Sequence, residues 1–236
     1  MIMRWLKPWE GTRTPEQKRR KIMPSPAWPD ALKHYLRQPL PDETLPITQM
    51  HFVALDFETT GLNAAEDKIL SMGMVDFTLE DIDIASSEEL YINHSEFIRP
   101  ETAKVNGLTP QSLAQGIALD EGINRLLERI RGKVIVAHSS NIENAFIQAY
   151  FSSQYQLKEL PTCFIDTLYI EQKFSYAGIS RAHSSYQLDD LRRHYNLPEY
   201  LLHSAASDAL ACAELFLVQS KKIDALPGIS LKRLMR

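Results

Sequence analysis

The chain has 236 residues, of which 44% are hydrophobic and 24% charged, a composition typical of a globular protein with one large domain or one domain plus an arm. Its formal net charge of −4 argues against nucleic-acid binding by overall positive charge, so such binding would come from a local site or from metal ions. The two cysteines show no CxxC spacing, no apolar run approaches the ~20 residues of a membrane span, and the basic N-terminus lacks the apolar core of a secretory signal. We therefore expect a cytoplasmic protein with no disulfide framework and no membrane partner.

Residues 1–50 are predicted to form an N-terminal arm. They hold eight of the 13 prolines and, with nine Lys or Arg against five Asp or Glu, a net charge of +4. Because proline removes backbone donors and interrupts helices, we predict extended structure with one short helix within PAWPDALKHYLRQ (26–38). The basic cluster Lys18–Lys21 has two interpretations: packing of the arm on its own domain, which we favour, or contact with nucleic-acid phosphates.

From residue 51 the pattern becomes α/β. The stretch HFVALDFE is apolar on both faces up to Asp56, as expected for a central strand, and the two apolar stretches that follow fit an antiparallel meander. CFIDTL is a weaker strand candidate. The predicted strands span 51–58, 69–79, 88–95, 134–138 and 163–168.

Helical periodicity dominates the second half of the chain. LDEGINRLLERIRG has an apolar stripe that closes at Gly132, and Thr109 before Pro110 is typical of a helix N-cap followed by proline at the first helical position. The predicted helices span 119–132, 141–151, 185–196 and 204–222, with weak helical character in the tail GISLKRLMR. The expected organisation is an arm (1–50), an α/β domain (51–220) and a basic tail (221–236).

Asp56 and Glu58 end the first predicted strand. Side chains at positions i and i+2 of a strand point to the same face, so the two like charges are held together. Unless a cation neutralised them, one carboxylate would be driven toward protonation, and Mg²⁺ or Mn²⁺ suits such oxygen ligands. The setting, a buried strand that ends in DFETTG, places the pair where α/β proteins carry their sites.

His203 and Asp208 form a second candidate pair. Ser204 or Ser207 is suited to cap the following helix, which would put Asp208 in its first turns and His203 on the incoming loop. A histidine with a pKa near ~6.5 accepts a proton from water at neutral pH.

Glu143 and Phe146 lie three positions apart on the helix predicted over 141–151, near one face. Considered alone, each of these two later candidates is more typical of ordinary surface residues than of a functional site.

Together, the order, spacing and context of these motifs resemble the DEDDh 3′–5′ exonuclease superfamily over roughly residues 50–220. The first family motif, Asp-x-Glu-Thr-Thr-Gly at a strand end, is matched by DFETTG (56–61). The third, a histidine with an aspartate five residues later, is matched by His203 and Asp208.

The second family motif is matched less closely. It usually reads His-Asn-x-x-Phe-Asp-x-x-Phe, whereas this chain reads HSSNIENAF from His138 to Phe146, with Ser139 after the histidine and Glu143 in place of the usual aspartate. Glutamate keeps the negative charge and adds one methylene, and because all four negative charges survive we expect the activity to be retained. The alternative is a site that binds one ion more weakly.

The resemblance implies a ribonuclease H-like fold: an α/β mixed sheet in which the antiparallel meander is joined by parallel strands and flanked by helices. It implies a 3′–5′ exonuclease that releases nucleoside 5′-monophosphates from single-stranded 3′ ends, with DNA as the first expectation and RNA as the alternative. It also implies two Mg²⁺ or Mn²⁺ ions, with His203 as the general base. The implied metal ligands are Asp56, Glu58, Glu143 and Asp208, and the implied substrate contacts are Thr59, Thr60, Gly61, Leu62 and Phe146.

One alternative of another class remains open, a non-catalytic module that binds nucleic acid or a polymerase. It would gain if Glu143 faced away from the other three carboxylates. QLKEL (156–160) and ISLKRLMR are candidate docking segments for a clamp or polymerase partner. A zinc hydrolase is disfavoured, because the seven histidines are scattered without an HExxH motif.

Overall fold

The computed structural model describes residues 13–94, 113–175, 185–200, 204–223 and 228–235, and the helix start expected at Thr109 lies outside them. The helices are α1 (Pro15–Arg19), α2 (Asp30–Arg37), the 3-10 turn η1 (Ile47–Gln49), α5 (Leu119–Ile130), α6 (Asn141–Tyr155), α7 (Thr167–Phe174), α9 (Leu188–His194), α10 (Ala205–Ile223) and α11 (Leu231–Leu234). The strands are β1 (Phe52–Thr59), β2 (Ile69–Phe77), β3 (Ile82–Tyr91), β4 (Val134–Ala137) and β5 (Phe164–Asp166).

Within the described residues the strands form one mixed sheet in the order β3-β2-β1-β4-β5. β1 pairs antiparallel with β2, and β2 with β3, which confirms the expected meander. β4 runs parallel to β1, and β5 runs parallel to β4 after the crossover through α6. β1 is therefore a central strand, and its side chains from 52 to 55 are fully buried, which explains its apolar sequence on both faces.

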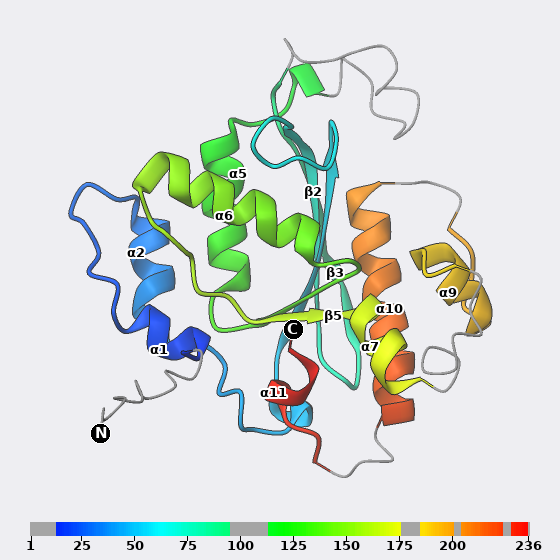
Figure 1. Ribbon diagram of the computed structural model, residues 1–236. Helices are drawn as coiled ribbons and strands as arrows, with labels where there is room; N and C mark the ends of the chain where they lie inside the picture. The colour runs from blue at the N-terminus through cyan, green and yellow to red at the C-terminus, as the bar shows by residue number, and fades with distance from the viewer. Residues whose placement is uncertain (1–12, 95–112, 176–184, 201–203, 224–227, 236) are drawn as a thin grey trace, which may run out of the picture.

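Helices cover both faces of the sheet (Figure 1). α2, α5 and α6 contribute to the core on one face, while α7, α10 and α11 contribute to the core on the other. Successive residues of β1 alternate between the two: Val53 and Leu55 join the first core, whereas Phe52 and Ala54 join the second. By the same alternation, Asp56 points to the side of the sheet that carries α10.

Two of the predicted strands differ most from the structure. β3 begins at Ile82, six residues before the predicted strand, because this edge strand carries exposed residues that hide its periodicity. The expectation of a strand over 163–168 was wrong after Asp166. The carboxylate of Asp166 accepts hydrogen bonds from the backbone N–H groups of Leu168 at 3.0 Å and Tyr169 at 3.5 Å, so it caps α7 and turns the chain into a helix.

Residues 13–50 pack on the rest of the chain. α2, which confirms the short helix expected in this region, buries Leu32, Tyr35 and Leu36 against the core on the α5 side. The hydroxyl of Tyr35 donates a hydrogen bond of 2.8 Å to the carbonyl of Pro161. This segment therefore adds both apolar contacts and a buried hydrogen bond to the structure.

The C-terminal tail pairs with the same N-terminal region. The N–H of Ile47 donates to the carbonyl of Ile229 at 3.1 Å, and the N–H of Leu231 donates to the carbonyl of Leu45 at 3.0 Å. α11 buries Leu231 and Leu234 in the core on the α10 side. The two ends of the described chain thus stabilise each other.

The basic cluster of α1 forms ion pairs within the protein. Lys18 lies 2.6 Å from Glu159, while Arg19 and Arg20 lie 2.7 and 2.8 Å from Glu16. The carboxylate of Glu16 also accepts a hydrogen bond of 3.0 Å from the N–H of Leu40, and the Arg19 guanidinium is the largest cause that lowers the pKa of Glu16 to about 2. These contacts support packing on the chain's own domain, the interpretation we favoured.

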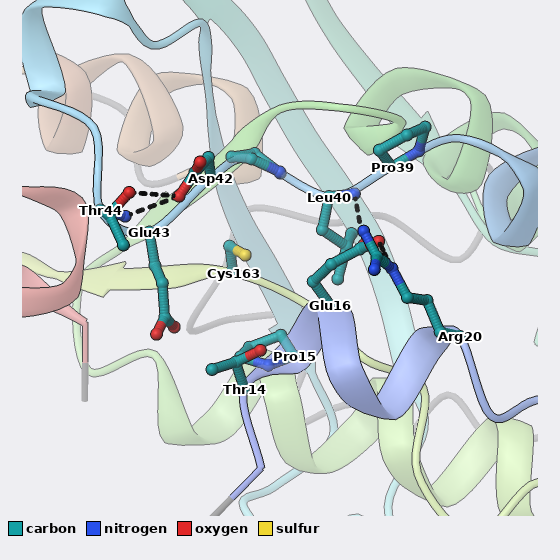
Figure 2. Close-up of a pocket in the computed structure, with 11 residues that line it drawn as sticks. Thr14, Pro15, Glu16, Arg20, Pro39, Leu40, Asp42, Glu43, Thr44 and Cys163 are labelled. Atoms are coloured by element: carbon teal, nitrogen blue, oxygen red, sulfur yellow. Dashed lines mark hydrogen bonds and ion pairs between the residues drawn. The ribbon is translucent and has the colours of Figure 1, made fainter.

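A pocket of about 380 Å³ lies between α1, the segment 39–44 and Cys163, and its lining residues are drawn in Figure 2. The carboxylate of Asp42 accepts hydrogen bonds from the backbone and hydroxyl of Thr44, and Glu16 is paired with Arg20. Glu43, the third acidic residue drawn there, lies 3.6 Å from Lys232, so each acidic group of this pocket has a partner within the protein.

None of the helices in the described part of the chain combines the length and apolarity needed to cross a bilayer.

Candidate active site and metal centre

The carboxyl ends of β1 and β4 lie where two helices begin. β4 ends at Ala137 and α6 starts at Asn141, while α10 starts at Ala205 on the opposite face of the sheet (Figure 1). Asp56 and Glu58 lie in the last half of β1, on the side that carries α10. Strand ends and helix starts therefore converge on one edge of the sheet, as in other α/β sites.

The start of α10 brings Asp208 to this edge. The hydroxyl of Ser204 accepts a hydrogen bond of 3.3 Å from the N–H of Ser207, and its carbonyl accepts one of 2.9 Å from the N–H of Asp208. The predicted serine cap is thus confirmed, with Asp208 in the first turn of α10.

One oxygen atom from each of Asp56, Glu58 and Asp208 lies within 4.8 Å of the other two. Two oxygens on opposite sides of Mg²⁺ lie about 4.2 Å apart, because each bond is about 2.1 Å long. Small side-chain rotations therefore let these three carboxylates share one divalent ion.

Glu143, in the first turn of α6, is a further carboxylate near Asp56. Its side chain is 2% exposed, and its Oε2 atom has no hydrogen-bond partner in the protein. After burial, the charge of Glu143 is the largest cause of the raised pKa of Asp56, so the two carboxylates are near each other. An orphaned buried oxygen near a further carboxylate is an environment that a divalent cation satisfies.

The electrostatics of the protein alone are unfavourable at this site. Burial, together with the charges of Glu143, Asp208 and Glu58, raises the pKa of Asp56 well above its ordinary value of 3.8. Burial raises the pKa of Glu143 to about 8, and the nearby charge of Asp166 acts in the same direction. Without cations the cluster therefore holds protons at neutral pH, and a divalent ion would replace them.

A fifth carboxylate, Glu89, was missed by sequence reasoning. Asp56 pairs with Gly73 of β2, and Gly73 pairs with Glu89 of β3, so both acids lie on one face with a glycine between them. The charge of Glu89 adds to the raised pKa of Asp56, and its Oε1 atom is buried without a hydrogen-bond partner. Only the register of three strands reveals this proximity, so no local sequence signal marks Glu89.

Asp166, also missed, fixes the segment that leads into α6. Its Oδ1 accepts from the N–H of Ser139 at 3.0 Å, and its Oδ2 accepts from the N–H of Ser140 at 3.1 Å. Ser139 has a φ of 63°, in the left-handed region that asparagine adopts more readily than serine. The asparagine usual at this motif position therefore fits the backbone better than the serine of this chain.

His138 connects this segment to the approach to α9. Its Nε2 lies 2.8 Å from the carbonyl of Tyr186, which can only accept, so Nε2 carries the proton, while Nδ1 lies 2.8 Å from the hydroxyl of Thr167. Burial is the main cause that lowers the pKa of His138 below 6.5. The imidazole is therefore a neutral connector between β4 and the segment before α9.

The turn after Glu58 is held by its own side chains. The hydroxyl of Thr59 donates to the carbonyl of Gly61 at 2.7 Å, and the hydroxyl of Thr60 donates to Asp67 at 2.9 Å. A Cβ on Gly61 would lie 2.5 Å from the Asp67 carboxylate, which explains the glycine. Leu62, at the tip, is 75% exposed and available for an apolar contact.

The other two predicted site residues are Phe146 and His203. Phe146 is 4% exposed and packs in the core on the α5 side of the sheet. His203 lies outside the described residues, directly before Ser204. Their roles at the site stay predictions.

The mixed sheet, its helices on both faces and the carboxylates at the end of β1 define a nuclease of ribonuclease H-like fold. The profile of the family described as Exonuclease matches residues 53–216, more than half of the chain. The DNA polymerase III subunit epsilon of Treponema pallidum is 32% identical over 165 residues, which cover 70% of this chain and 74% of that protein. The chain belongs to this exonuclease family, within the DEDDh 3′–5′ exonuclease superfamily.

Solved structures agree on the fold. The nuclease domain of 3′hExo, a DEDDh family member bound to rAMP, superposes with a TM-score of 0.59 at 10% identity over 72% of this chain and 92% of that one. Exonuclease I of E. coli in complex with a dT13 oligonucleotide gives 0.60 at 15% identity over 75% of this chain and 42% of that one. Relatives of the DNA polymerase III PolC type are matched over only about 12% of their length. Enzymes of this superfamily use divalent metal ions, and the acidic cluster fits that chemistry.

Proposed function

We propose that the protein removes nucleoside 5′-monophosphates one at a time from single-stranded 3′ ends of DNA, in a metal-dependent reaction. The observation that carries this proposal is the gathering of Asp56, Glu58 and Asp208 within 4.8 Å, with the carboxylate of Glu143, which has an orphaned buried oxygen, near Asp56. Four negative charges at one site match two divalent ions, Mg²⁺ or Mn²⁺. When bound, such ions neutralise phosphate charge and lower the pKa of a water molecule that becomes the nucleophile.

The roles of the chain's own residues follow from their positions. Asp56, Glu58, Glu143 and Asp208 would hold the ions, which would place the phosphodiester at the end of β1. The imidazole of His203 accepts the proton of the attacking water, which requires the neutral form. In this proposal the turn from Thr59 to Leu62 receives the terminal nucleotide, with Leu62 supplying an apolar contact to its base.

The choice of DNA over RNA is supported by the relatives. The matched relative from Treponema pallidum is a DNA polymerase subunit, and exonuclease I was solved with a DNA oligonucleotide. The alternative, a 3′–5′ exoribonuclease or oligonucleotidase, is favoured by the likeness to a nuclease domain bound to rAMP. Association with a polymerase and a cytoplasmic location belong to the same proposal.

The test is a nuclease assay on single-stranded DNA and RNA of the same sequence, each labelled at the 5′ end. With Mg²⁺ or Mn²⁺ we expect a ladder that shortens by single nucleotides from the 3′ end, faster on DNA, and no cleavage in EDTA. Asp56→Ala should be inactive, while Asp83→Ala, which removes an exposed carboxylate of β3, should match the wild type. Equal degradation by the wild type and Asp56→Ala, or none by the wild type with either metal, would contradict the proposal.

A further inference from the structure

α10 packs on the sheet through a glycine. A Cβ built on Gly73 of β2 would lie 1.9 Å from the carbonyl carbon and oxygen of Ala205 and 2.3 Å from the nitrogen of Ala206. These are backbone atoms of the first turn of α10, and the contact is the shortest of its kind among the glycines that the structure describes. The absent side chain thus lets the start of α10 lie directly on β2.

Each of the two residues in this contact is close to one carboxylate of the acidic cluster. Gly73 is the register partner of Asp56 across β1 and β2. Ala205 is fully buried, and Asp208 follows it by three residues in the same turn, with its N–H bonded to the carbonyl of Ser204 at 2.9 Å. The distance from α10 to β2 at Gly73 therefore sets the distance from Asp208 to the carboxylates of β1.

We propose that Gly73 is a positioning residue for the metal centre, because it sets the depth at which α10 presents Asp208 to Asp56 and Glu58. The inference rests on the proposed function, since it assigns Gly73 a role in binding the divalent ion.

The geometry gives the size of the effect. In Gly73→Ala the contact with Ala205 must lengthen from 1.9 Å to at least 3.0 Å, and to 3.4 Å for an ordinary van der Waals contact, so the first turn of α10 must retreat by about 1.1–1.5 Å. The three ligand oxygens already span up to 4.8 Å, and an ion with bonds of about 2.1 Å holds opposite oxygens about 4.2 Å apart. Asp208 would then be out of reach, and we expect affinity for the ion to fall about 10- to 100-fold, as for other supporting residues of metal sites.

The experiment measures Mn²⁺ binding to the full chain by isothermal titration calorimetry, with circular dichroism as the check of folding. The matched control is Gly122→Ala on α5, where the added Cβ meets the flexible end of the Ile92 side chain at 2.7 Å and lies on the other face of the sheet. We expect wild-type affinity in Gly122→Ala and the 10- to 100-fold loss in Gly73→Ala.

A second variant separates positioning from general damage to the fold. Asp208→Glu lengthens the side chain by about 1.5 Å, the length of one carbon–carbon bond. In the Gly73→Ala background it should restore part of the lost affinity, whereas in the wild-type background it should not increase affinity.

The outcomes are distinguishable. Unchanged Mn²⁺ affinity in Gly73→Ala, or no recovery in Gly73→Ala/Asp208→Glu, overturns the inference and leaves the proposed function standing. A Gly73→Ala chain that does not fold also overturns it, because the glycine would then be required by the fold rather than by the metal centre. If the wild type itself binds no Mn²⁺, the proposed function fails first.

Discussion

Replacing Glu143 with glutamine should stabilise the metal-free protein. The side chain is 2% exposed, and burial raises its pKa from an ordinary 4.5 to about 8. A carboxylic acid with a raised pKa contributes its full stability below pH 4.5 and loses it as the pH rises through 8, since the unfolded chain releases the proton first. Glutamine is neutral and nearly isosteric, so folding requires neither protonation of this side chain nor burial of a negative charge.

The magnitude follows from the two pKa values. At 1.36 kcal/mol per pKa unit, the penalty removed by Glu143→Gln is about 1 kcal/mol at pH 5, about 3 kcal/mol at pH 7 and at most about 5 kcal/mol above pH 8. Divalent cations should reverse the order of stability, because they bind the wild-type carboxylate and the amide is a poorer ligand.

The assay is urea denaturation at pH 5, 7 and 8, in EDTA and in Mn²⁺. Glu171→Gln is the matched control. Its carboxylate is fully buried but accepts hydrogen bonds from the hydroxyl of Tyr195 at 2.7 Å and the amide of Gln219 at 3.0 Å, so we expect it to be destabilising in both conditions. If Glu143→Gln lowered the free energy of unfolding in EDTA at pH 8, the description of Glu143 as an unneutralised buried acid would be refuted.

Four further results are expected. His203→Ala should reduce the exonuclease rate about 10²- to 10⁴-fold, and the wild-type rate should fall below pH ~6.5, a decline that a pH–rate profile of the variant would not share. Ser139→Asn should raise the free energy of unfolding by about 1 kcal/mol, since asparagine suits a φ of 63°, and no gain in urea denaturation would contradict this. Arg192→Leu should lower the free energy of unfolding by about 3 kcal/mol in the same assay, because its buried guanidinium lies 2.8 Å from Glu214. No loss of stability would mean that the two groups are not paired in solution. Tyr35→Phe should cost about 1 kcal/mol through the lost hydrogen bond of α2, and an unchanged midpoint would mean that this bond adds no stability.

The elements that could be predicted from the sequence are those with local signals. β1 could be predicted because its apolar run ends in two carboxylates. The start of α10 could be predicted because Ser204 precedes a stretch with helical periodicity. The spacing of Leu32, Tyr35 and Leu36 indicates the apolar face through which α2 packs, although the proline-rich flanks suggested extended structure.

The parts that could not be predicted depend on partners distant in sequence. Asp166 ends β5 and caps α7 while it also binds the N–H groups of Ser139 and Ser140, so its role needs both segments in place. Glu89 approaches Asp56 only through the register of β3 on β2. Gly73 looks like an ordinary small residue within a strand until α10 is placed on it.

The site is best understood as a balance between helix ends and like charges. Glu143 and Asp208 lie in the first turns of α6 and α10, where helix dipoles favour negative charge by about 0.3–1 kcal/mol each. That benefit is smaller than the penalty of about 3 kcal/mol at pH 7 that burial and the other surroundings of Glu143 impose on its ionised form, so the helix ends do not keep the cluster ionised. Divalent cations can keep the carboxylates ionised, because they neutralise the negative charges directly. The stability of this chain should therefore depend on the same ions as the proposed reaction, and metal-dependent unfolding would report on the assembled site even where no nucleic acid is present.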